Sequence, residues 1–304
     1  MNTPSNSVSD SSLDSQAIAP AAMSATRPMY WSVRRELWEN RSIYIAPLVV
    51  AGVTLFGFLI ATIGRAVSTT NLAQRRGVLQ EPYNFAMGLI MVTTFVVGVF
   101  YCLDALHGER RDRSILFWKS LPVSDLTTVL AKASIPLIVL PLLTFALVVA
   151  TQLIMLLLGT LVLLGSGLSV AALWTQSSLF HMSLLLLYHL LTIHALWHAP
   201  LYGWLLLVSG WARRAVFLWA ALPPLAICVV EKIVFNSSHF AAMLGYRFAG
   251  GAEAFTAPGR LPMDLMTHLT PGRFLSTPGL WIGLAFAAVF LVAAVRLRRY
   301  REPI

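Results

Sequence analysis

Long apolar runs dominate this sequence and limit what it can fold into. A helix needs about 20 apolar residues to cross the hydrocarbon core of a bilayer. We therefore expect residues 28–304 to form one all-α domain, a polytopic membrane helix bundle with about six transmembrane helices. The run at 179–209 could also break at Pro200, because proline has no backbone N–H to donate. The expected spans are 43–64, 85–106, 134–164, 179–209, 215–235 and 279–295.

The charged residues also favour a membrane protein. Only 12% of the residues are charged, against about 25% in a typical soluble domain. The net charge is +9, but the basic residues cluster at the ends of the apolar runs. Since no basic stripe with interleaved aromatic residues occurs in the sequence, we expect no nucleic-acid partner. Segments between membrane spans that are rich in Lys and Arg usually lie in the cytoplasm. Here every second segment is the richer one, and this alternation includes both ends of the chain, so we expect both termini in the cytoplasm.

Two segments precede the first apolar run. Residues 1–27 are rich in Ser and Ala and show no periodicity, so a disordered cytoplasmic tail is expected. Residues 28–41 are amphipathic, with Trp31 and Trp38 on one helical face and Glu36 on the other. Because tryptophan suits the level of the lipid headgroups, we expect a helix lying in the membrane interface. An ordinary cytosolic helix is the alternative.

The segment between the second and third runs, residues 107–132, is the most informative part of the chain. Dense charge gives way to a short apolar helix, Ile115–Trp118, which must end before Pro122. Ser124 then offers an N-cap for a helix that leads into the third run. An apolar helix on the aqueous side of a membrane is typical of a protein-binding surface. The alternative is a positively charged hairpin whose aromatic residues anchor at the interface.

This segment resembles a loop of a known transporter family. Glu-Arg-Arg at 109–111, Ser-Ile-Leu-Phe-Trp-Lys-Ser-Leu-Pro-Val-Ser at 114–124 and then Lys132 are similar to the loop after the second span of bacterial ABC transporter permeases of type 2. The layout is similar too: an amphipathic entry helix, about six spans, and a long extracytoplasmic segment at 236–278. In the family, that last segment holds short re-entrant helices.

The resemblance implies a function and a set of contacts. The chain would be the permease subunit of an ATP-driven exporter in the bacterial plasma (inner) membrane. Its loop would hold the coupling helix, which fits a cleft on a separate ABC ATP-binding subunit. Because two ATP-binding subunits need two such loops, a second copy of the chain would complete a homodimeric pathway. The expected ATPase contacts are Glu109, Arg111, Asp112, Arg113, Ser114, Ile115, Leu116, Phe117, Trp118, Lys119, Ser120, Leu121 and Pro122.

The chain itself lacks the common motif that binds nucleotide. No Gly-x-x-x-x-Gly-Lys-Ser/Thr run occurs, so the chain cannot hold phosphates as a P-loop does. We therefore expect a non-catalytic transport subunit with no cofactor of its own, and ATP and Mg²⁺ on the partner ATPase. The lipid bilayer is a further expected partner. The identity of the transported substrate is left open by the sequence.

Ionisable residues inside the apolar runs are costly and usually have a purpose. His194 and His198 are four residues apart and share a helical face, whereas His189 would point to another side. They could hydrogen-bond neighbouring helices or line a wet pathway; a metal site would lack an acidic third ligand nearby. Glu231 would pair with an arginine of the outer segment or lie at an outer gate. Pro223–Pro224 should kink or break the fifth span.

Two other functions stay open on this sequence. The His-x-x-x-His pair and Glu231 could belong to an intramembrane enzyme, although no His-Glu-x-x-His motif or nucleophile elbow supports one. The chain could also be a regulatory membrane scaffold that binds a partner through the loop at 107–132.

Overall fold

The structure, a computed structural model, describes residues 26–66, 75–120, 123–165, 179–248 and 271–300. Every secondary-structure element in these ranges is a helix. Five helices are long and apolar enough to cross a membrane, and a bent helix pair adds a sixth crossing if it counts as one span. At this level the expected all-α membrane bundle is confirmed. The expected tail at 1–27 falls almost wholly outside the described residues.

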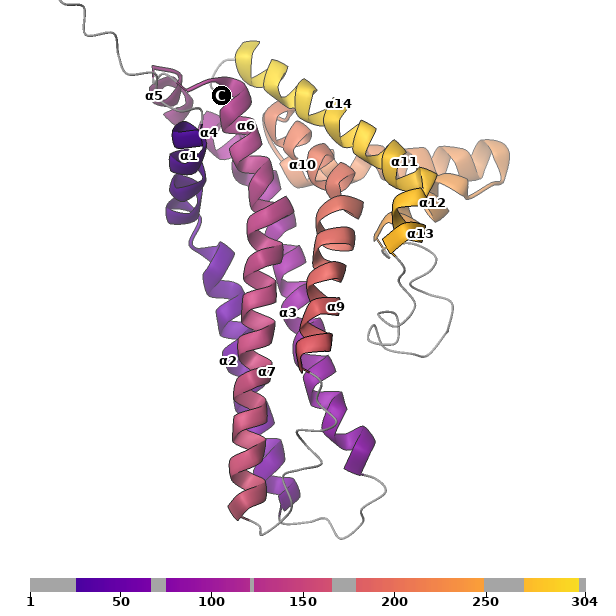
Figure 1. Ribbon diagram of the computed structural model, residues 1–304. Helices are drawn as coiled ribbons and strands as arrows, with labels where there is room; N and C mark the ends of the chain where they lie inside the picture. The colour runs from indigo at the N-terminus through magenta and orange to yellow at the C-terminus, as the bar shows by residue number, and fades with distance from the viewer. Residues whose placement is uncertain (1–25, 67–74, 121–122, 166–178, 249–270, 301–304) are drawn as a thin grey trace, which may run out of the picture.

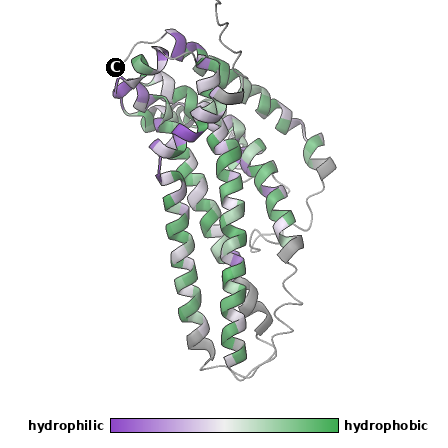
Figure 2. Cartoon of the chain, turned by 60° about the vertical axis from the view of Figure 1, so that its left-hand side comes forward, coloured by the Kyte–Doolittle hydropathy of each residue, from purple (hydrophilic) through white to green (hydrophobic). Residues whose placement is uncertain are grey.

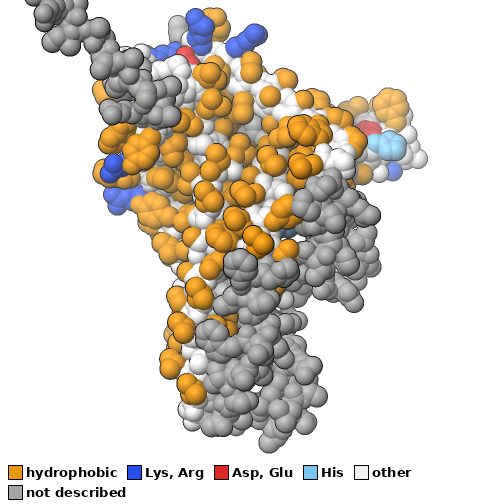
Figure 3. Space-filling model, in the orientation of Figure 1, with side chains coloured by type: hydrophobic (Ala, Val, Ile, Leu, Met, Phe, Trp, Pro, Cys, Tyr) orange, Lys and Arg blue, Asp and Glu red, His pale blue; other side chains and the backbone are white. Residues whose placement is uncertain are grey.

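Four helices run side by side and form the long part of the molecule (Figure 1). Met87 and Ile90 of the second of them pack with Val148 and Leu186 of its neighbours. These helices consist mostly of hydrophobic residues (Figure 2), and apolar side chains cover much of the face seen in Figure 3, as a lipid environment requires. The four are α2 (Ser42–Ala66), α3 (Arg75–Ala105), α7 (Leu140–Gly165) and α9 (Leu179–His189).

One end of the bundle carries short helices, and hydrophilic residues gather there (Figure 2). The third apolar run begins at this end, and its first helix starts where the sequence predicts. The side-chain oxygen of Ser124 accepts a hydrogen bond from the N–H of Thr127 at 3.0 Å, which confirms the expected N-cap. The helices at this end are α1 (Thr26–Glu39), α4 (His107–Arg111), α5 (Ser114–Ser120) and α6 (Asp125–Ser134), and η1 (Ile135–Val139) joins α6 to α7.

The face of α1 that packs against the protein carries Glu36, from the side that the sequence suggested would be polar, together with Val33 and Leu37 from the apolar side. Glu36 is 2% exposed, whereas Trp31 and Trp38 are 58% and 71% exposed. The carboxylate therefore points into the protein and the two indole rings point outward. The reason is that Glu36 meets Lys132 of α6, a buried cation that offsets the cost of removing the carboxylate from water.

The fourth apolar run is broken close to its proline. Helix α9 continues into a π-helical segment, η2 (Leu190–Trp197), and α10 (Ala199–Trp211) follows after a bend of 45°. At the bend, the N–H of His198 donates to the carbonyl oxygen of Ile193, five residues back, at 3.2 Å. Pro200 lies in the first turn of α10, where a missing N–H costs little.

Helix α11 (Val216–Phe235) leans away from the four-helix bundle (Figure 1) and is continuous. Of the kink or break expected at Pro223–Pro224, the break does not occur. Pro224 cannot donate to the carbonyl oxygen of Ala220, four residues back. The indole N–H of Trp204 on α10 donates to that oxygen instead, at 3.1 Å. A side chain of the neighbouring helix thus supplies the donor that the proline lacks.

The last helix, α14 (Pro278–Tyr300), packs closely on α10. A Cβ atom on Gly203 of α10 would lie 3.3 Å from the carbonyl oxygen of Ala287, so glycine allows the two backbones to approach. Two short helices precede α14, in the segment expected to hold re-entrant helices. These are α12 (His239–Phe248) and α13 (Pro271–Ser276).

Candidate functional site

The loop singled out in the sequence forms two short helices, α4 and α5, joined by a tight turn. Contacts with α10 fix the first of them. The hydroxyl oxygen of Ser209 accepts hydrogen bonds from two backbone N–H groups at the start of α4, at 2.9 and 3.0 Å. Arg110 donates to the carbonyl oxygen of Gly210 at 2.8 Å. Arg113 then takes a left-handed conformation, with φ of 57°, and α5 begins at the next residue.

Helix α5 turns one apolar side chain inward and two outward. Ile115 is buried, whereas Leu116 and Phe117 are 59% and 60% exposed. Helix α5, which carries the exposed pair, lies at the end of the molecule where the short helices gather (Figure 1). Among the described residues, therefore, these two side chains form an uncovered apolar surface on the helix that the sequence predicts to bind a partner.

Two contacts fix α5 to helices that are distant in sequence. The guanidinium of Arg35 on α1 stacks on the ring of Trp118, with its Cζ atom 3.7 Å from the ring centroid. Lys119 donates to the carbonyl oxygen of Arg299 on α14 at 3.4 Å. A displacement of α5 must therefore move α1 and α14 or break these contacts.

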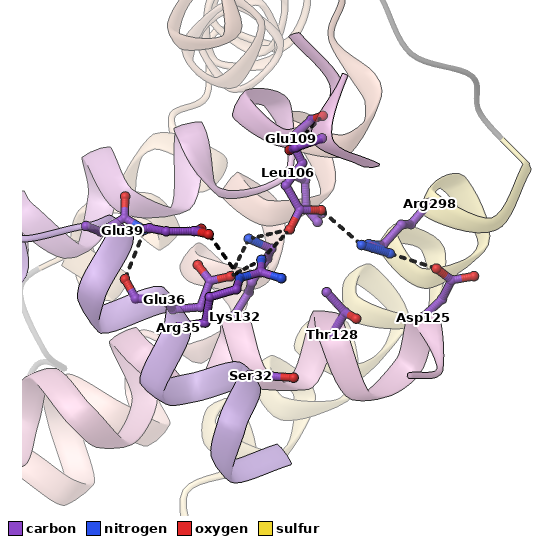
Figure 4. A network of polar contacts seen from close by, with 12 residues as sticks. Ser32, Arg35, Glu36, Glu39, Leu106, Glu109, Asp125, Thr128, Lys132 and Arg298 are labelled. Carbon is purple, nitrogen blue, oxygen red and sulfur yellow. Dashed lines mark hydrogen bonds and ion pairs between the residues drawn. The ribbon is translucent and has the colours of Figure 1, made fainter. Parts of the chain in front are cut away.

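Arg35, which stacks on Trp118 of α5, belongs to an ion-pair network of six charged side chains from four helices (Figure 4). Three are acidic and three are basic, so their charges balance. Lys132 is central, with its Nζ atom 2.8 Å from the carboxylate of Glu36 and 3.1 Å from that of Glu109. We call this network the polar cluster: Arg35 and Glu36 of α1, Glu109 of α4, Asp125 and Lys132 of α6, and Arg298 of α14.

Glu109 joins the two halves of the polar cluster. Arg35 donates to one of its oxygens at 2.8 Å, and Arg298 donates to the other at 3.0 Å. Arg298 also donates to Asp125 at 2.8 Å. The hydroxyl of Tyr101 donates to Glu36 at 2.9 Å. Buried charges are tolerated when partners of opposite sign surround them, as they do here.

The electrostatics keep Arg35 charged. Burial alone would lower the pKa of its guanidinium, because burial penalises the charged form. The carboxylates of Glu36, Glu39 and Glu109 outweigh that effect and raise the pKa above its ordinary value. A permanently charged Arg35 can hold the polar cluster and the ring of Trp118 at the same time. Through the stack of Arg35 on Trp118, the polar cluster thus links α5 to the longer helices α1, α6 and α14.

The residues expected to contact an ATPase differ in how far they are exposed. Glu109 uses both carboxylate oxygens inside the polar cluster, so the surface available to a partner lies on α5 and the turn before it. Leu121 and Pro122 lie outside the described residues. Of the others, Glu109 and Ile115 are buried, Ser114 and Trp118 are half-buried, and Arg111, Asp112, Arg113, Leu116, Phe117, Lys119 and Ser120 are exposed.

Sequence reasoning did not single out Glu36, Asp125 or Arg298 as site residues. The residues of the polar cluster are far apart in the chain: Arg298 and Glu109 are separated by 189 positions. A local signal did exist for Glu36, which lies between Val33 and Leu37, two side chains that pack against the core. An acid with apolar helical neighbours on both sides indicates a buried partner, but it does not identify that partner.

The histidines of the fourth span come together differently from the expectation. The ring centroids of His189 and His194 are 5.9 Å apart, and those of His194 and His198 are 5.6 Å apart. The expectation that His189 points elsewhere is wrong, because it assumed α-helical periodicity. In a π-helix, residues five apart come onto one face. Among the described residues no group of three or more His, Cys, Asp or Glu side chains is arranged to hold a metal ion.

Glu231 closes the corner between α11 and α12. Its carboxylate accepts hydrogen bonds from the hydroxyl of Ser237 at 2.7 Å and from the N–H groups of His239 at 2.7 Å and Phe240 at 2.8 Å. The side chain therefore caps the first turn of α12, where N–H groups lack helical partners. Within the described ranges no arginine pairs with it. Capping is therefore the role that the structure shows for this acid.

Comparison with protein-family models, with curated proteins and with solved structures finds no match to this chain.

Proposed function

We propose that this chain is the membrane subunit of an ATP-driven exporter of the type 2 ABC class. The observation that carries the proposal is the exposed apolar pair, Leu116 and Phe117, at the polar end of a membrane helix bundle. A partner that covers the pair removes apolar surface from water, which favours binding. The partner would be a separate ATP-binding subunit that holds ATP and Mg²⁺. The membrane would be the bacterial plasma membrane, with both termini in the cytoplasm.

The contacts of α5 suggest how ATP-driven movement would reach the membrane. Closure of the ATPases would push on α5. The stack of Trp118 on Arg35 would pass the displacement to α1, and the polar cluster would pass it to α6 and α14. Because α6 continues through η1 into α7, a movement at its first turn extends along the whole bundle. Substrate would then move between two copies of the chain.

The exposure of α11 supports a second copy. Ala220 is its only buried residue, although the helix is apolar along most of its length. A second copy facing α11 and α2 would cover part of this surface and enclose a pathway between the subunits. The complex would then contain two copies of this chain and two ATPases.

The proposal is tested by a substitution that weakens ATPase binding to the exposed face of α5 and leaves the helix bundle intact. Leu116→Asp places a charge on the exposed face of α5, where a bound ATPase would have to desolvate it. We expect the amount of ATPase that co-purifies with the tagged chain from native membranes to fall at least about tenfold, which corresponds to about 1.4 kcal/mol. Nucleotide hydrolysis by the captured complex should fall in parallel.

The matched control is Leu126→Asp, since Leu126 on α6 is 53% exposed and lies at the same end of the molecule. It should leave ATPase capture unchanged. Equal capture by the Leu116→Asp variant and the unmodified chain would refute the assignment of α5. A regulatory scaffold would differ in another way: it would bind a partner through α5 and yet move no solute when ATP is hydrolysed.

A further inference from the structure

The outward side of α1 carries aromatic rings and a cation in an unusual arrangement. The guanidinium carbon of Arg34 lies 5.2 Å from the ring centroid of Trp31 and 5.4 Å from that of Trp38. Tyr30 packs edge-on against Trp31. All four side chains are exposed. We call this surface the outer face of α1: Tyr30, Trp31, Arg34 and Trp38.

The outer face of α1 lies on the side opposite to the contacts that fix the helix. Val33, Glu36 and Leu37 face the protein, where they meet the core and the polar cluster. Among the described residues Arg34 forms no ion pair, so its guanidinium N–H groups are available to an anion. The two indole rings on either side hold that cation in place by cation–π attraction.

The position of α1 along the chain indicates what the outer face meets. Helix α1 ends at Glu39, and α2 begins at Ser42. Because α2 is long and apolar enough to span the membrane, its first turns mark the level at which the chain leaves the hydrocarbon core. Phospholipid headgroups lie at that level, and tryptophan is enriched there. Arg41, also exposed, adds a second positive charge at the same point.

We propose that the outer face of α1 binds the headgroup of an anionic phospholipid. The planar guanidinium of Arg34 would donate two hydrogen bonds to phosphate oxygens, a geometry that suits arginine better than lysine. Trp31 and Trp38 would lie beside the glycerol backbone, with their apolar rings toward the acyl chains. The positive charge and the continuity with α2 favour a lipid over a protein as the occupant.

Quenching of tryptophan fluorescence by brominated lipids tests the proposal on the chain alone. The chain is reconstituted in phosphatidylcholine bilayers that contain a small fraction of either dibrominated phosphatidylglycerol or dibrominated phosphatidylcholine. Subtracting the signal of a Trp31→Phe/Trp38→Phe variant isolates the two rings of α1. We expect dibrominated phosphatidylglycerol to quench them about fivefold more effectively, the factor that one basic residue contributes near an anionic surface.

The matched variants are Arg34→Gln and Arg213→Gln. Arg213 is an exposed arginine at the end of another apolar run, and no tryptophan ring within the described ranges stacks on its guanidinium. Arg34→Gln should abolish the preference for phosphatidylglycerol, whereas Arg213→Gln should keep it. Size-exclusion profiles of both variants report whether the chain is folded.

Three results would overturn the proposal. The first is equal quenching of the unmodified chain by the two lipids, and the second is a preference that persists in folded Arg34→Gln. The third is the absence of quenching by either lipid, which would mean that protein covers the outer face of α1. If Arg34→Gln does not fold, Arg34→Lys replaces it, and it should keep part of the preference because it keeps the charge.

Discussion

Glu36 illustrates how a single residue can decide which way a helix faces. On the helical wheel it belongs to the polar side of α1, which suggests contact with water. In the structure it is buried, because Lys132 and the hydroxyl of Tyr101 both meet its carboxylate. Amphipathic periodicity therefore identified α1 as a helix but did not show that Glu36 would be buried. The periodicity shows that two faces differ, not which of them has a protein neighbour.

The polar cluster should be sensitive to single substitutions and tolerant of a matched pair. Glu36→Gln or Lys132→Met alone leaves an uncompensated buried charge, which costs about 3–5 kcal/mol. The double variant restores the balance, with Arg35 and Arg298 facing Glu109 and Asp125. We expect the melting temperature in detergent to fall strongly in each single variant and to recover by at least half in the double.

The control for the polar cluster is Glu39→Gln. The side chain of Glu39 is 50% exposed, and among the described residues its one ion-pair partner is Arg35, at the edge of the cluster. A pair of that kind contributes about 0–1 kcal/mol. A double variant no more stable than the worse single variant would contradict the account of coupled buried charges.

The contact between Trp204 and Ala220 predicts a second coupling. Trp204→Phe leaves the carbonyl oxygen of Ala220 without a donor, because Pro224 cannot supply one; an unpaired buried carbonyl costs about 1–3 kcal/mol. With Pro224→Ala in place, a backbone N–H becomes available, and Trp204→Phe should cost less by about that amount. The four melting temperatures of this double-mutant cycle measure the difference. Additive effects would mean that the indole does not replace the missing donor.

At the scale of elements, the sequence predicted which segments form helices better than it predicted how those helices bend or wind. The break in the fourth span could be predicted because proline restricts the backbone in a known way. The π-helical form of η2 could not, since no residue type demands it, and so the contact of His189 with His194 was missed. Conversely, α11 continues through two prolines because a donor comes from another helix. That donor is a tertiary contact, which local rules do not contain.

The turn that sets the direction of α5 depends on the backbone of Arg113. Its φ of 57° is left-handed, which glycine adopts freely and a β-branched residue adopts only with difficulty. Arg113→Val should therefore destabilise the turn by about 1–2 kcal/mol relative to Arg113→Gly. Both variants remove the same charge, so the difference between them reports the backbone. Thermal unfolding and limited proteolysis at α5 measure it, and equal behaviour would show that the turn tolerates another conformation.

At the scale of the whole molecule, apolar periodicity and run length predicted the architecture. Each expected span corresponds to a described helix or helix pair, because the bilayer imposes both a length and an apolar surface. The polar cluster could not be predicted in the same way. Four of its six pairs join residues 74 to 189 positions apart, and a single sequence carries no record of such distant contacts. The sequence gives the positions of the charged residues along the chain, and the structure gives the ion pairs that they form.

The central claim is that the exposed face of α5 meets an ATPase, and a photo-crosslinking amino acid at position 117 tests it most directly. Phe117 points away from the chain's own bundle, so the probe should leave the fold intact. On illumination of intact cells, we predict one major protein adduct that mass spectrometry identifies as a nucleotide-binding ATPase. The same probe at Phe100 of α3, which is 61% exposed, should give no such adduct. Adducts at position 117 with lipid alone, or with a protein that binds no nucleotide, would contradict the account.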